Sequence, residues 1–451
     1  MPYDNVVTSL EQFHSWFAAR AGATDYRVKE VPLHSLAGWH SDPDTGNLVH
    51  RTGRFYSIEG LRSTVRDGGG ERSWAQPVIV QPEIGILGIL VRTFDGVPHC
   101  LMQAKMEPGN VNSLQLSPTV QATHSNYTRV HRGSAVPYLE YFTDPRRGRP
   151  LADSLQSEQG SWFLGKRNRN VIVETTEDVP LRDGFCWLTV RQLGELLRLD
   201  NLVNMDARCV LAALPSPAAD DATVAEDSFA GALARSAAAP GDATALLSRF
   251  TALKSRRSLV RRRIPLNQVA GWHRTTDRIA HEEGRYFCVI GVDVEAADRE
   301  VPRWSQPLLA PASRGVIALL TRRTDGVLRL LLRARTEAGT FDTVEFGPTV
   351  QCAPRNYPSD PPGRPPFLDE VLRAPSDRVR FDAVHSEEGG RFHHAQNRYL
   401  VVEAADDFPE DVPDGYLWAT VGETLELLRH AHYLNVEARC LLACLRSLGS
   451  R

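Results

Sequence analysis

The sequence has few of the features that identify common protein classes. It contains no run of 18 apolar residues, so no helix is expected to span a membrane. The segment from Met1 to Arg20 lacks a basic start followed by an apolar stretch, and we expect no export signal. The chain carries 52 basic and 55 acidic side chains, a net charge of −3. This balance argues against a nucleic-acid-binding protein, which would show a basic domain or stripe.

Cysteine is scarce and irregularly placed. The seven cysteines are odd in number, scattered, and never spaced as CxxC. Such a pattern is typical of reduced thiols in a cytoplasmic protein and not of a disulfide framework or a zinc site. We therefore expect a cytoplasmic protein with no metal bound through cysteine.

The common cofactor and catalytic motifs are also missing. No GxGxxG follows a predicted strand, and no GxxxxGK[ST], HExxH or GxSxG occurs. No tyrosine is followed four residues later by lysine, so the short-chain reductase pairing is absent. We expect neither a dinucleotide cofactor nor a metal.

The chain contains one long internal repeat instead. With 451 residues it is too long for one ordinary core, and two domains are the first expectation. Segments of the first half return in order in the second: AGWH at 37–40 and 270–273, PTVQ at 118–121 and 348–351, and NMDARC at 204–209 as NVEARC at 435–440. A repeat of roughly 230 residues indicates two tandem domains and not a solenoid.

Both copies predict the same elements. We divide the chain into a first copy (residues 1–214), a linker (215–242) rich in Ala, Ser, Asp, Pro and Gly, and a second copy (243–451). Each copy predicts an opening helix, short strands, a hairpin with an Asp-Gly turn, and closing helices. Asp242 is a possible N-cap of the helix 243–255, and a short helix is possible over 228–235. The fold class is α+β, with a mixed sheet flanked by helices in each copy.

Polar side chains gather beside the predicted strands of each copy, where a pocket can collect convergent groups. In the first copy they occupy residues 105–110, 115–131 and 157–170; in the second, 335–340, 345–357 and 386–399. Two of only four lysines, Lys105 and Lys166, fall among them. Paired Arg, Asn, Gln and Tyr need partners when buried, so packing alone explains them poorly. Trp74 and Trp304 could stack on a nucleobase or belong to the core.

The runs PTVQATHSNYTRVH (118–131), YLEYF (138–142) and SEQGSWF (157–163), with SEEGGRF (386–392) and NRY (397–399), resemble the NDP-hexose 2,3-dehydratases of deoxysugar biosynthesis. The resemblance covers nearly the whole chain apart from the linker. It implies tandem Nudix-like domains, a homodimer, and a nucleotide-sugar pocket in each copy, of which only one need be catalytic.

Neither copy carries the Nudix box GX5EX7REUXEEXGU. Glu387, Glu388 and Gly389 resemble its tail, but no Arg-Glu pair precedes them at the required spacing. Without that carboxylate set there is no evident magnesium site for diphosphate cleavage. The resemblance thus implies a binding fold that is reused for elimination.

The implied substrate is a dTDP-4-keto-6-deoxyhexose. A base would remove the proton on C3, which the 4-ketone acidifies, and a donor would hold the enolate oxygen. Loss of the C2 hydroxyl gives an enol, which becomes a 3,4-diketo-2,6-dideoxyhexose. This product would pass to a 3-ketoreductase or an aminotransferase.

The resemblance and the polar clusters together suggest roles for individual residues. We place the working pocket in the first copy, although Glu345, which replaces Gln115, keeps the second copy open. Lys105 and Tyr127 are candidates for enolate stabiliser and proton-transfer group, and Glu158 or His131 for the base. Arg167, Arg169 and Asn170 would grip the diphosphate. The remaining substrate-binding candidates are Trp74, Gln121, Asn126, Arg129, Lys166, Trp304, Glu345, Gln351, Asn356, Tyr357, Asn397, Arg398 and Tyr399.

Two other functions stay open. The chain could be a nucleotide-sugar hydrolase, against which the missing Nudix box argues. It could also be a tandem module that binds sugar nucleotides without turnover.

Overall fold

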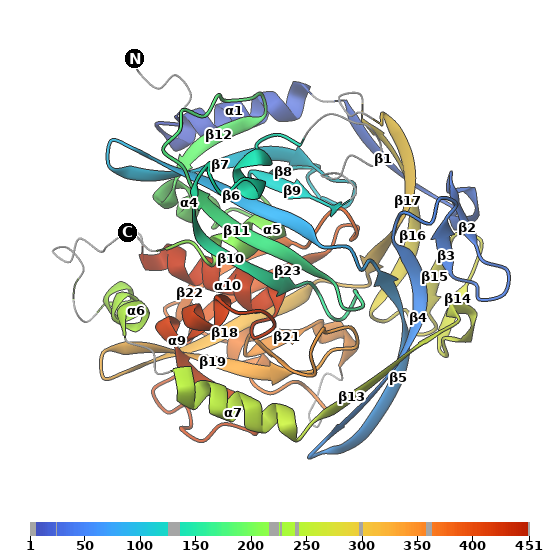
Figure 1. Ribbon diagram of the computed structural model, residues 1–451. Helices are drawn as coiled ribbons and strands as arrows, with labels where there is room; N and C mark the ends of the chain where they lie inside the picture. Colours follow the sequence, from blue (N-terminus) through green and yellow to red (C-terminus); the bar gives the residue numbers. More distant parts are fainter. Residues whose placement is uncertain are drawn as a thin grey trace.

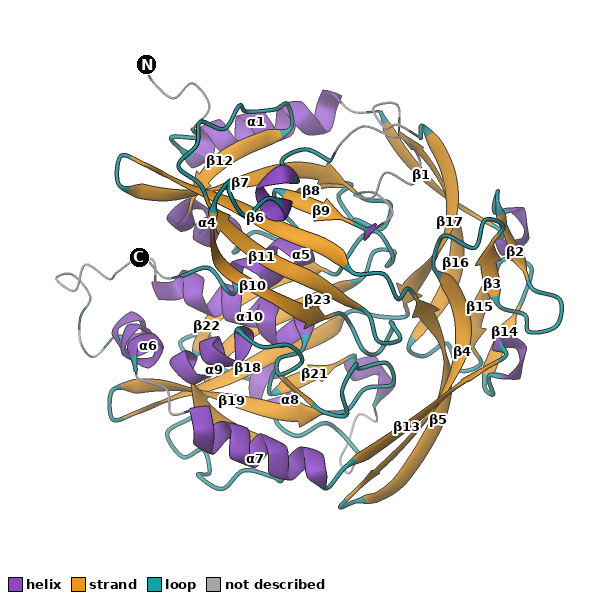
Figure 2. Cartoon of the chain, in the orientation of Figure 1, coloured by secondary structure: helices purple, strands orange, loops and turns teal. Residues whose placement is uncertain are grey.

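The computed structural model describes residues 6–23, 25–124, 136–215, 225, 228–239, 243–296, 301–357 and 363–449. The fold contains two large and two smaller sheets with helices between and around them (Figures 1 and 2). The α+β class predicted from the sequence is confirmed at this level. Among the described residues, no helix is long and apolar enough to cross a membrane.

The first large sheet belongs entirely to the first copy. Its order is β10-β11-β6-β7-β12, with β8 paired to β7 and β9 to β6. β11 runs parallel to β6, whereas the other pairs are antiparallel, so the sheet is mixed as predicted. Its strands are β6 (Gly85–Phe94), β7 (Val97–Met106), β8 (Leu114–Ser117), β9 (Val120–Ala122), β10 (Arg149–Ser157), β11 (Arg167–Glu174) and β12 (Phe185–Thr189).

The second large sheet has the same topology in the second copy. Its order is β20-β19-β18-β23-β22, with β21 paired to β18 and β24 to β19, and β23 runs parallel to β18. Its strands are β18 (Gly315–Thr324), β19 (Val327–Arg335), β20 (Glu345–Gly347), β21 (Val350–Cys352), β22 (Val379–Ser386), β23 (Gln396–Glu403) and β24 (Tyr416–Thr420).

The two smaller sheets exchange strands between the copies. One contains β2 (Trp39–Ser41), β3 (Leu48–His50), β4 (Ser57–Asp67), β5 (Gly70–Val80) and, from the second copy, β13 (Ser258–Ile264). The other contains β14 (Trp272–Arg274), β15 (Arg278–His281), β16 (Phe287–Ala296), β17 (Arg303–Pro311) and, from the first copy, β1 (Tyr26–Val31). Each copy therefore completes a sheet of the other, side by side at the right of Figure 1. The division at residues 214 and 243 stays a prediction from the sequence.

The helices lie between and outside the large sheets. They are α1 (Leu10–Ala23), α3 (Glu140–Thr143), α4 (Val190–Leu196), α5 (Met205–Leu211), α6 (Phe229–Ala238), α7 (Ala243–Ser255), α8 (Leu368–Leu372), α9 (Val421–Leu428) and α10 (Val436–Arg446). Short 3₁₀ turns occupy Leu33–Ser35, Leu266–Gln268, Pro354–Asn356 and Ser447–Gly449. α5 and α10 pack on one another between the two large sheets (Figure 1). One hydrophobic core runs through both copies around them.

The repeated Asn-x-x-Ala-Arg-Cys motif explains how these central helices are held. Asn204 and Asn435 cap α5 and α10 by accepting a hydrogen bond from the backbone three residues on. Arg208 is fully buried and donates to the carbonyl of Ser386 in the second copy, over 2.8 Å. Arg439 donates reciprocally to the carbonyl of Ser157 in the first copy. The arginine of each motif thus binds the end of a strand in the other copy, Ser386 at the end of β22 and Ser157 at the end of β10.

The Asp-Gly hairpins form as predicted. Asp95 and Gly96 have φ values of 49° and 81°, and Asp325 and Gly326 have 50° and 74°. Two consecutive positive φ values define the type I′ turn, which suits the twist of a two-stranded hairpin. The helix at 243–255 has the predicted bounds, and the helix predicted at 228–235 is α6, capped by Ser228. The proposed N-cap, Asp242, lies outside the described residues.

Candidate active site

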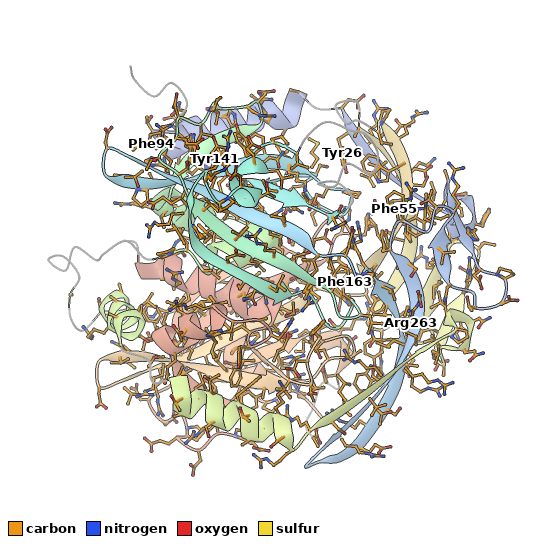
Figure 3. All side chains as sticks on the ribbon, in the orientation of Figure 1. Tyr26, Phe55, Phe94, Tyr141, Phe163 and Arg263 are labelled. Carbon is orange, nitrogen blue, oxygen red and sulfur yellow. The ribbon has the colours of Figure 1, made fainter. Side chains whose placement is uncertain are left out.

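The candidate site is a cavity of about 1210 Å³ in the first copy. Its lining comes from the first large sheet, both smaller sheets and a loop of the second copy. Tyr26, Phe55 and Phe163 are three of its lining residues, and Figure 3 labels them between the large first-copy sheet and the smaller sheets. Because both copies line the cavity, it is a composite site.

One side of the cavity is a chain of polar groups beyond the end of β7. The ammonium nitrogen of Lys105 lies 3.5 Å from Glu107 Oε1 and 3.3 Å from the carbonyl oxygen of Gln121. The amide of Gln121 donates to Glu107 Oε1 over 2.8 Å and accepts from Asn204 over 3.2 Å. These bonds hold the Lys105 ammonium at the cavity wall, where it can donate to a ligand oxygen.

Asp206 adds a second carboxyl beside this chain. It is the second residue of α5, only 4% exposed, and it lines the cavity. Burial raises its pKa well above the usual value, and the nearby carboxyls of Glu158, Glu388 and Glu107 raise it further. Burial and the neighbouring carboxyls therefore favour the protonated form of Asp206.

Glu158 and Lys166 line an adjacent wall at the facing ends of β10 and β11. Both are about 6% exposed. Asn168 donates to Glu158 Oε1 over 2.7 Å, and Lys166 donates to the carbonyl of Glu83. Burial raises the pKa of Glu158, while Arg439 and Lys166 oppose that rise. Burial likewise lowers the pKa of Lys166. The wall thus holds a carboxyl whose pKa is raised and an amine whose pKa is lowered, so the two pKa values lie closer together than usual.

The second copy contributes the loop that follows β22. Glu388, Gly390 and Arg391 of this loop line the cavity. The guanidinium of Arg391 lies 4.2 Å from the ring centre of Tyr56 and donates to Gln81 over 3.1 Å. The loop therefore docks on first-copy side chains.

The repeated Trp-x-Gln-Pro motif fixes this loop. The indole of Trp304 donates to Gln306 Oε1 over 2.9 Å, and the amide of Gln306 donates to the carbonyl of Gly390 over 2.7 Å. In the first copy Trp74, Gln76 and Ser161 make the equivalent bonds, over 3.0 and 2.6 Å. Trp304 also lines the cavity, so the same side chain orients Gln306, which clamps the Gly390 loop, and forms part of the cavity wall.

The side chains at the equivalent positions of the second copy's cluster differ from those of the first-copy cavity. Arg335, Glu337, Gln351, Asn435 and Glu437 form the equivalent polar chain, with arginine in place of lysine. At the other equivalent positions the second-copy cluster has Gln159 for Glu388, Trp162 for Arg391 and Ala395 for Lys166. The titratable groups are thus concentrated in the first-copy cavity.

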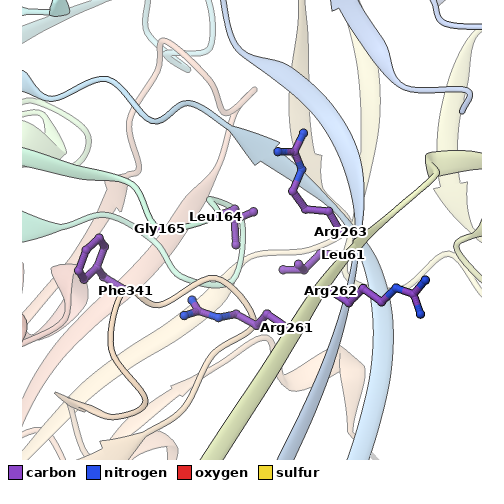
Figure 4. A pocket seen from close by; sticks show the side chains of 7 residues that line it. All are labelled: Leu61, Leu164, Gly165, Arg261, Arg262, Arg263 and Phe341. Atoms are coloured by element: carbon purple, nitrogen blue, oxygen red, sulfur yellow. The ribbon is translucent and has the colours of Figure 1, made fainter.

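A second hollow, of about 650 Å³, lies beside β13 (Figure 4). Leu164, Gly165, Arg261 and Phe341 are among its lining residues, and Arg261 and Arg262 point to opposite sides of the strand. Arg261 donates to the carbonyl of Thr340, so its guanidinium already has a partner.

Several sequence candidates meet in the first-copy cavity. Lys105, Gln121, Glu158, Lys166 and Trp304 all line it. Tyr127, Asn126, Arg129 and His131 lie outside the described residues.

Other candidates have structural partners outside the cavity lining. Arg169 and Arg398 form two-pronged ion pairs with Asp153 and Asp382. Asn397 and the fully buried Tyr399 both donate to Glu387. The rest are placed as follows: Arg167 lies over Phe341, Trp74 bonds Gln76, Gln351 bonds Glu337, Asn356 accepts from the backbone of Tyr286, Tyr357 is 39% exposed, and Asn170 is buried on β11.

Glu345 is buried between the copies and not in the cavity lining. It is 1% exposed, and its Oε2 accepts from Ser157 over 2.9 Å. Burial raises its pKa to about 8. The side-chain oxygen of its first-copy counterpart Gln115 likewise accepts from the hydroxyl of Ser386, over 3.0 Å. A packing role common to both copies explains these two positions.

The sequence profile of the NDP-hexose 2,3-dehydratase family matches residues 10–214 and 243–445. The chain belongs to this family. Three relatives are each named dTDP-4-dehydro-6-deoxy-alpha-D-glucopyranose 2,3-dehydratase. The protein of Streptomyces violaceoruber is 55% identical over 98% of both chains. That of Saccharopolyspora spinosa is 50% identical over 98% of this chain and 93% of its own, and that of Amycolatopsis orientalis is 49% identical over 99% and 92%.

Sequence reasoning missed several cavity residues of this NDP-hexose 2,3-dehydratase family member. Glu107, Asp206, Glu388 and Arg391 were not selected, although each lies in a repeated motif. A usable signal was present at Glu388, because its counterpart Gln159 differs in charge while both neighbours are the same. Asp206 and Glu437 gave another signal, as the one carboxyl in the first turn of helices that are mainly apolar. Within the described residues, no group of three or more His, Cys, Asp and Glu is arranged to hold a metal ion.

Proposed function

We propose that this protein is a dTDP-4-keto-6-deoxyhexose 2,3-dehydratase whose working site is the first-copy cavity. The observation that carries the proposal is the concentration of titratable groups there. Lys105, Glu158 and Lys166 line one cavity, whereas the second copy has arginine at the first position and alanine at the last. Family membership and the names of the three relatives support the same reaction.

Lys105 is the proposed stabiliser of the enolate. Its ammonium group lies at the cavity wall, 3.5 Å from Glu107 Oε1 and 3.3 Å from the carbonyl oxygen of Gln121. Removal of the C3 proton places negative charge on the C4 oxygen of the sugar. A fixed cation in a site shielded from water stabilises that charge more than water would.

Glu158 is the proposed base. Its carboxyl is buried beside the cavity and keeps one hydrogen bond, from Asn168. Burial raises its pKa above that of an exposed carboxylate, which makes it a stronger base, and Arg439 and Lys166 oppose that rise. From the sequence, Tyr127 stays a candidate for the proton-transfer group and His131 an alternative base.

The nucleotide end of the substrate would occupy the outer part of the cavity. Trp39, Phe55 and Trp304 offer aromatic faces to a nucleobase there. Arg391 offers a planar guanidinium to the diphosphate. The sequence-based candidates for this role, Arg167, Arg169 and Asn170, stay predictions.

The finer expectations from the sequence also stay proposals. They are a Nudix-like fold for each copy, a homodimer, a place in the cytoplasm, and a role in deoxysugar formation for antibiotics. The 3,4-diketo product would be consumed by a 3-ketoreductase or an aminotransferase, which act on the new ketone.

Turnover of dTDP-4-keto-6-deoxyglucose by the purified protein in EDTA tests this function, with a 3-ketoreductase and NADPH as trap. We expect a trapped 2,6-dideoxy sugar, and no product when C4 carries a hydroxyl. Intact substrate that binds in calorimetry would favour a binding module instead. Release of dTMP would favour a hydrolase.

A further inference from the structure

Glu388 reaches the first-copy cavity from the second copy. Its loop crosses the first copy at two glycines, where the backbone N–H of Gly109 donates to the carbonyl of Gly389 over 2.7 Å. A Cβ on Gly109 would lie 1.7 Å from the backbone carbonyl oxygen of Phe392, so this close approach requires glycine there. The crossing delivers the Glu388 side chain to the cavity lining.

The two carboxyl oxygens of Glu388 have different surroundings. Oε1 accepts a hydrogen bond from the backbone N–H of Gly390, over 3.0 Å. Oε2 is buried and has no hydrogen-bond partner among the residues that the structure describes. A carboxyl oxygen that is shielded from water and not engaged by the protein can serve a bound ligand.

The repeat supplies a comparison for this position. In the second copy's cluster, Gln159 occupies the place of Glu388 and donates to Glu387 over 2.8 Å. Glu387 is the counterpart of Glu158. The same juxtaposition in the first-copy cavity sets Glu388 near Glu158, so two carboxyls stand where the other cluster has an amide and a carboxylate. An amide can satisfy a hydrogen bond there but cannot exchange a proton.

We infer that Glu388 is the general acid that protonates the departing C2 hydroxyl, working with Glu158 as an acid–base pair contributed by the two copies. The inference rests on the proposed function and deepens it.

The reaction balances with these two carboxyls. Glu158 takes the proton from C3, and the C3–H electron pair forms the C3–C4 double bond of the enolate. The enolate returns its electrons to form a C2–C3 double bond as the C2–O bond breaks. Glu388 gives its proton to the departing oxygen, which leaves as water. A proton then passes from Glu158 to Glu388 and restores the pair. The enol takes a solvent proton at C2 and releases the proton of its C3 hydroxyl to solvent, which gives the 3-ketone.

The electrostatics agree with these roles. Burial raises the pKa of Glu388 to about 7, with further contributions from Glu107 and Glu158 that Arg391 and Lys105 oppose. A group with a pKa near neutrality is partly protonated at working pH and suits a general acid. Two neighbouring carboxyls that resist simultaneous ionisation are a common arrangement for such pairs.

The E388Q variant tests the inference. Glutamine keeps an oxygen that can accept from Gly390, so we expect normal folding and binding of dTDP-4-keto-6-deoxyglucose. We expect turnover to fall about 100- to 10,000-fold, the usual contribution of a general acid. In D2O the variant should still exchange the C3 hydrogen of recovered substrate, because Glu158 remains. The matched control is E437Q, which changes another buried carboxyl outside the cavity lining and should turn over like the parent.

Loss of elimination with retained C3 exchange supports the inference. Elimination at the parent rate would overturn it. Loss of both elimination and exchange in a folded variant that binds would also overturn it, since Glu388 would then act before the C2 step. A parent protein that neither eliminates nor exchanges would overturn the proposed function itself.

Discussion

Replacing Glu345 by glutamine should change the thermal stability of the protein without changing its turnover. Glu345 is 1% exposed, and its Oε2 accepts from Ser157 over 2.9 Å. His432 Nδ1 lies 3.8 Å from Oε1, and burial lowers the pKa of that histidine. The first copy already has glutamine here, as Gln115, bonded to Ser386. E345Q therefore introduces a side chain whose fit is demonstrated elsewhere in the same molecule.

The magnitude follows from the raised pKa. Burial moves the pKa of Glu345 from 4.5 to about 8, so its protonated form is favoured in the folded chain. The stability contributed by that proton is present below pH 4.5 and is lost as the pH rises toward 8. At about 1.4 kcal/mol per pH unit, the parent is destabilised by about 4 kcal/mol at pH 8 relative to a neutral side chain. For 451 residues this corresponds to about 4 °C in Tm.

Thermal unfolding of E345Q and the parent at several pH values measures this effect. We expect nearly equal Tm values near pH 5 and a higher Tm for E345Q at pH 8, because other titrating groups cancel in the comparison. A Tm difference that does not vary with pH would refute the argument from burial. Turnover should be unchanged, and its loss in a folded E345Q would place the base in the second copy instead.

Three further experiments test the packing at a glycine, the clamp on the Gly390 loop and the charge beside Glu158. Gly339→Ala should prevent folding or lower the Tm strongly, because a Cβ there would lie 1.7 Å from the Phe163 carbonyl oxygen. The control Gly22→Ala, whose Cβ meets nothing within 4 Å, should keep or raise the Tm in the same melting experiment. Gln306→Leu should lower kcat/KM about tenfold or more in steady-state kinetics, since it releases the Gly390 loop that carries Glu388 and Arg391; an unchanged kcat/KM would contradict this role of the loop. Lys166→Met removes a cation that lowers the pKa of Glu158, so the acidic limb of the pH profile of kcat/KM should move to higher pH; an unmoved limb would argue against Glu158 as the base.

Local structure could be predicted from the sequence because it depends on neighbouring residues. The Asp95-Gly96 turn and the helix at 243–255 follow from turn chemistry and apolar spacing. The exchange of β1 and β13 could not be predicted. Either strand has the same pattern whichever smaller sheet it joins, and the choice depends on the path of the chain between the copies.

The site was predicted in part for the same reason. Lys105, Glu158 and Lys166 were found because they lie in one copy's polar clusters and remain in that copy's cavity. The segment that contains Glu388 and Arg391 was predicted to belong to a pocket of the second copy, but both residues line the first-copy cavity. A sequence does not show which copy's cavity a loop will line. The role of Arg169 at the diphosphate stays a prediction; its guanidinium pairs with Asp153 on the neighbouring strand β10, a contact that the sequence did not indicate.

Turnover of dTDP-4-keto-6-deoxyglucose in D2O, with the product trapped by a 3-ketoreductase and NADPH, tests the central claim most directly. Elimination in the first-copy cavity predicts a 2,6-dideoxy sugar that has lost its C2 oxygen and carries one solvent deuterium at C2. A recovered sugar that keeps its C2 hydroxyl would contradict the account.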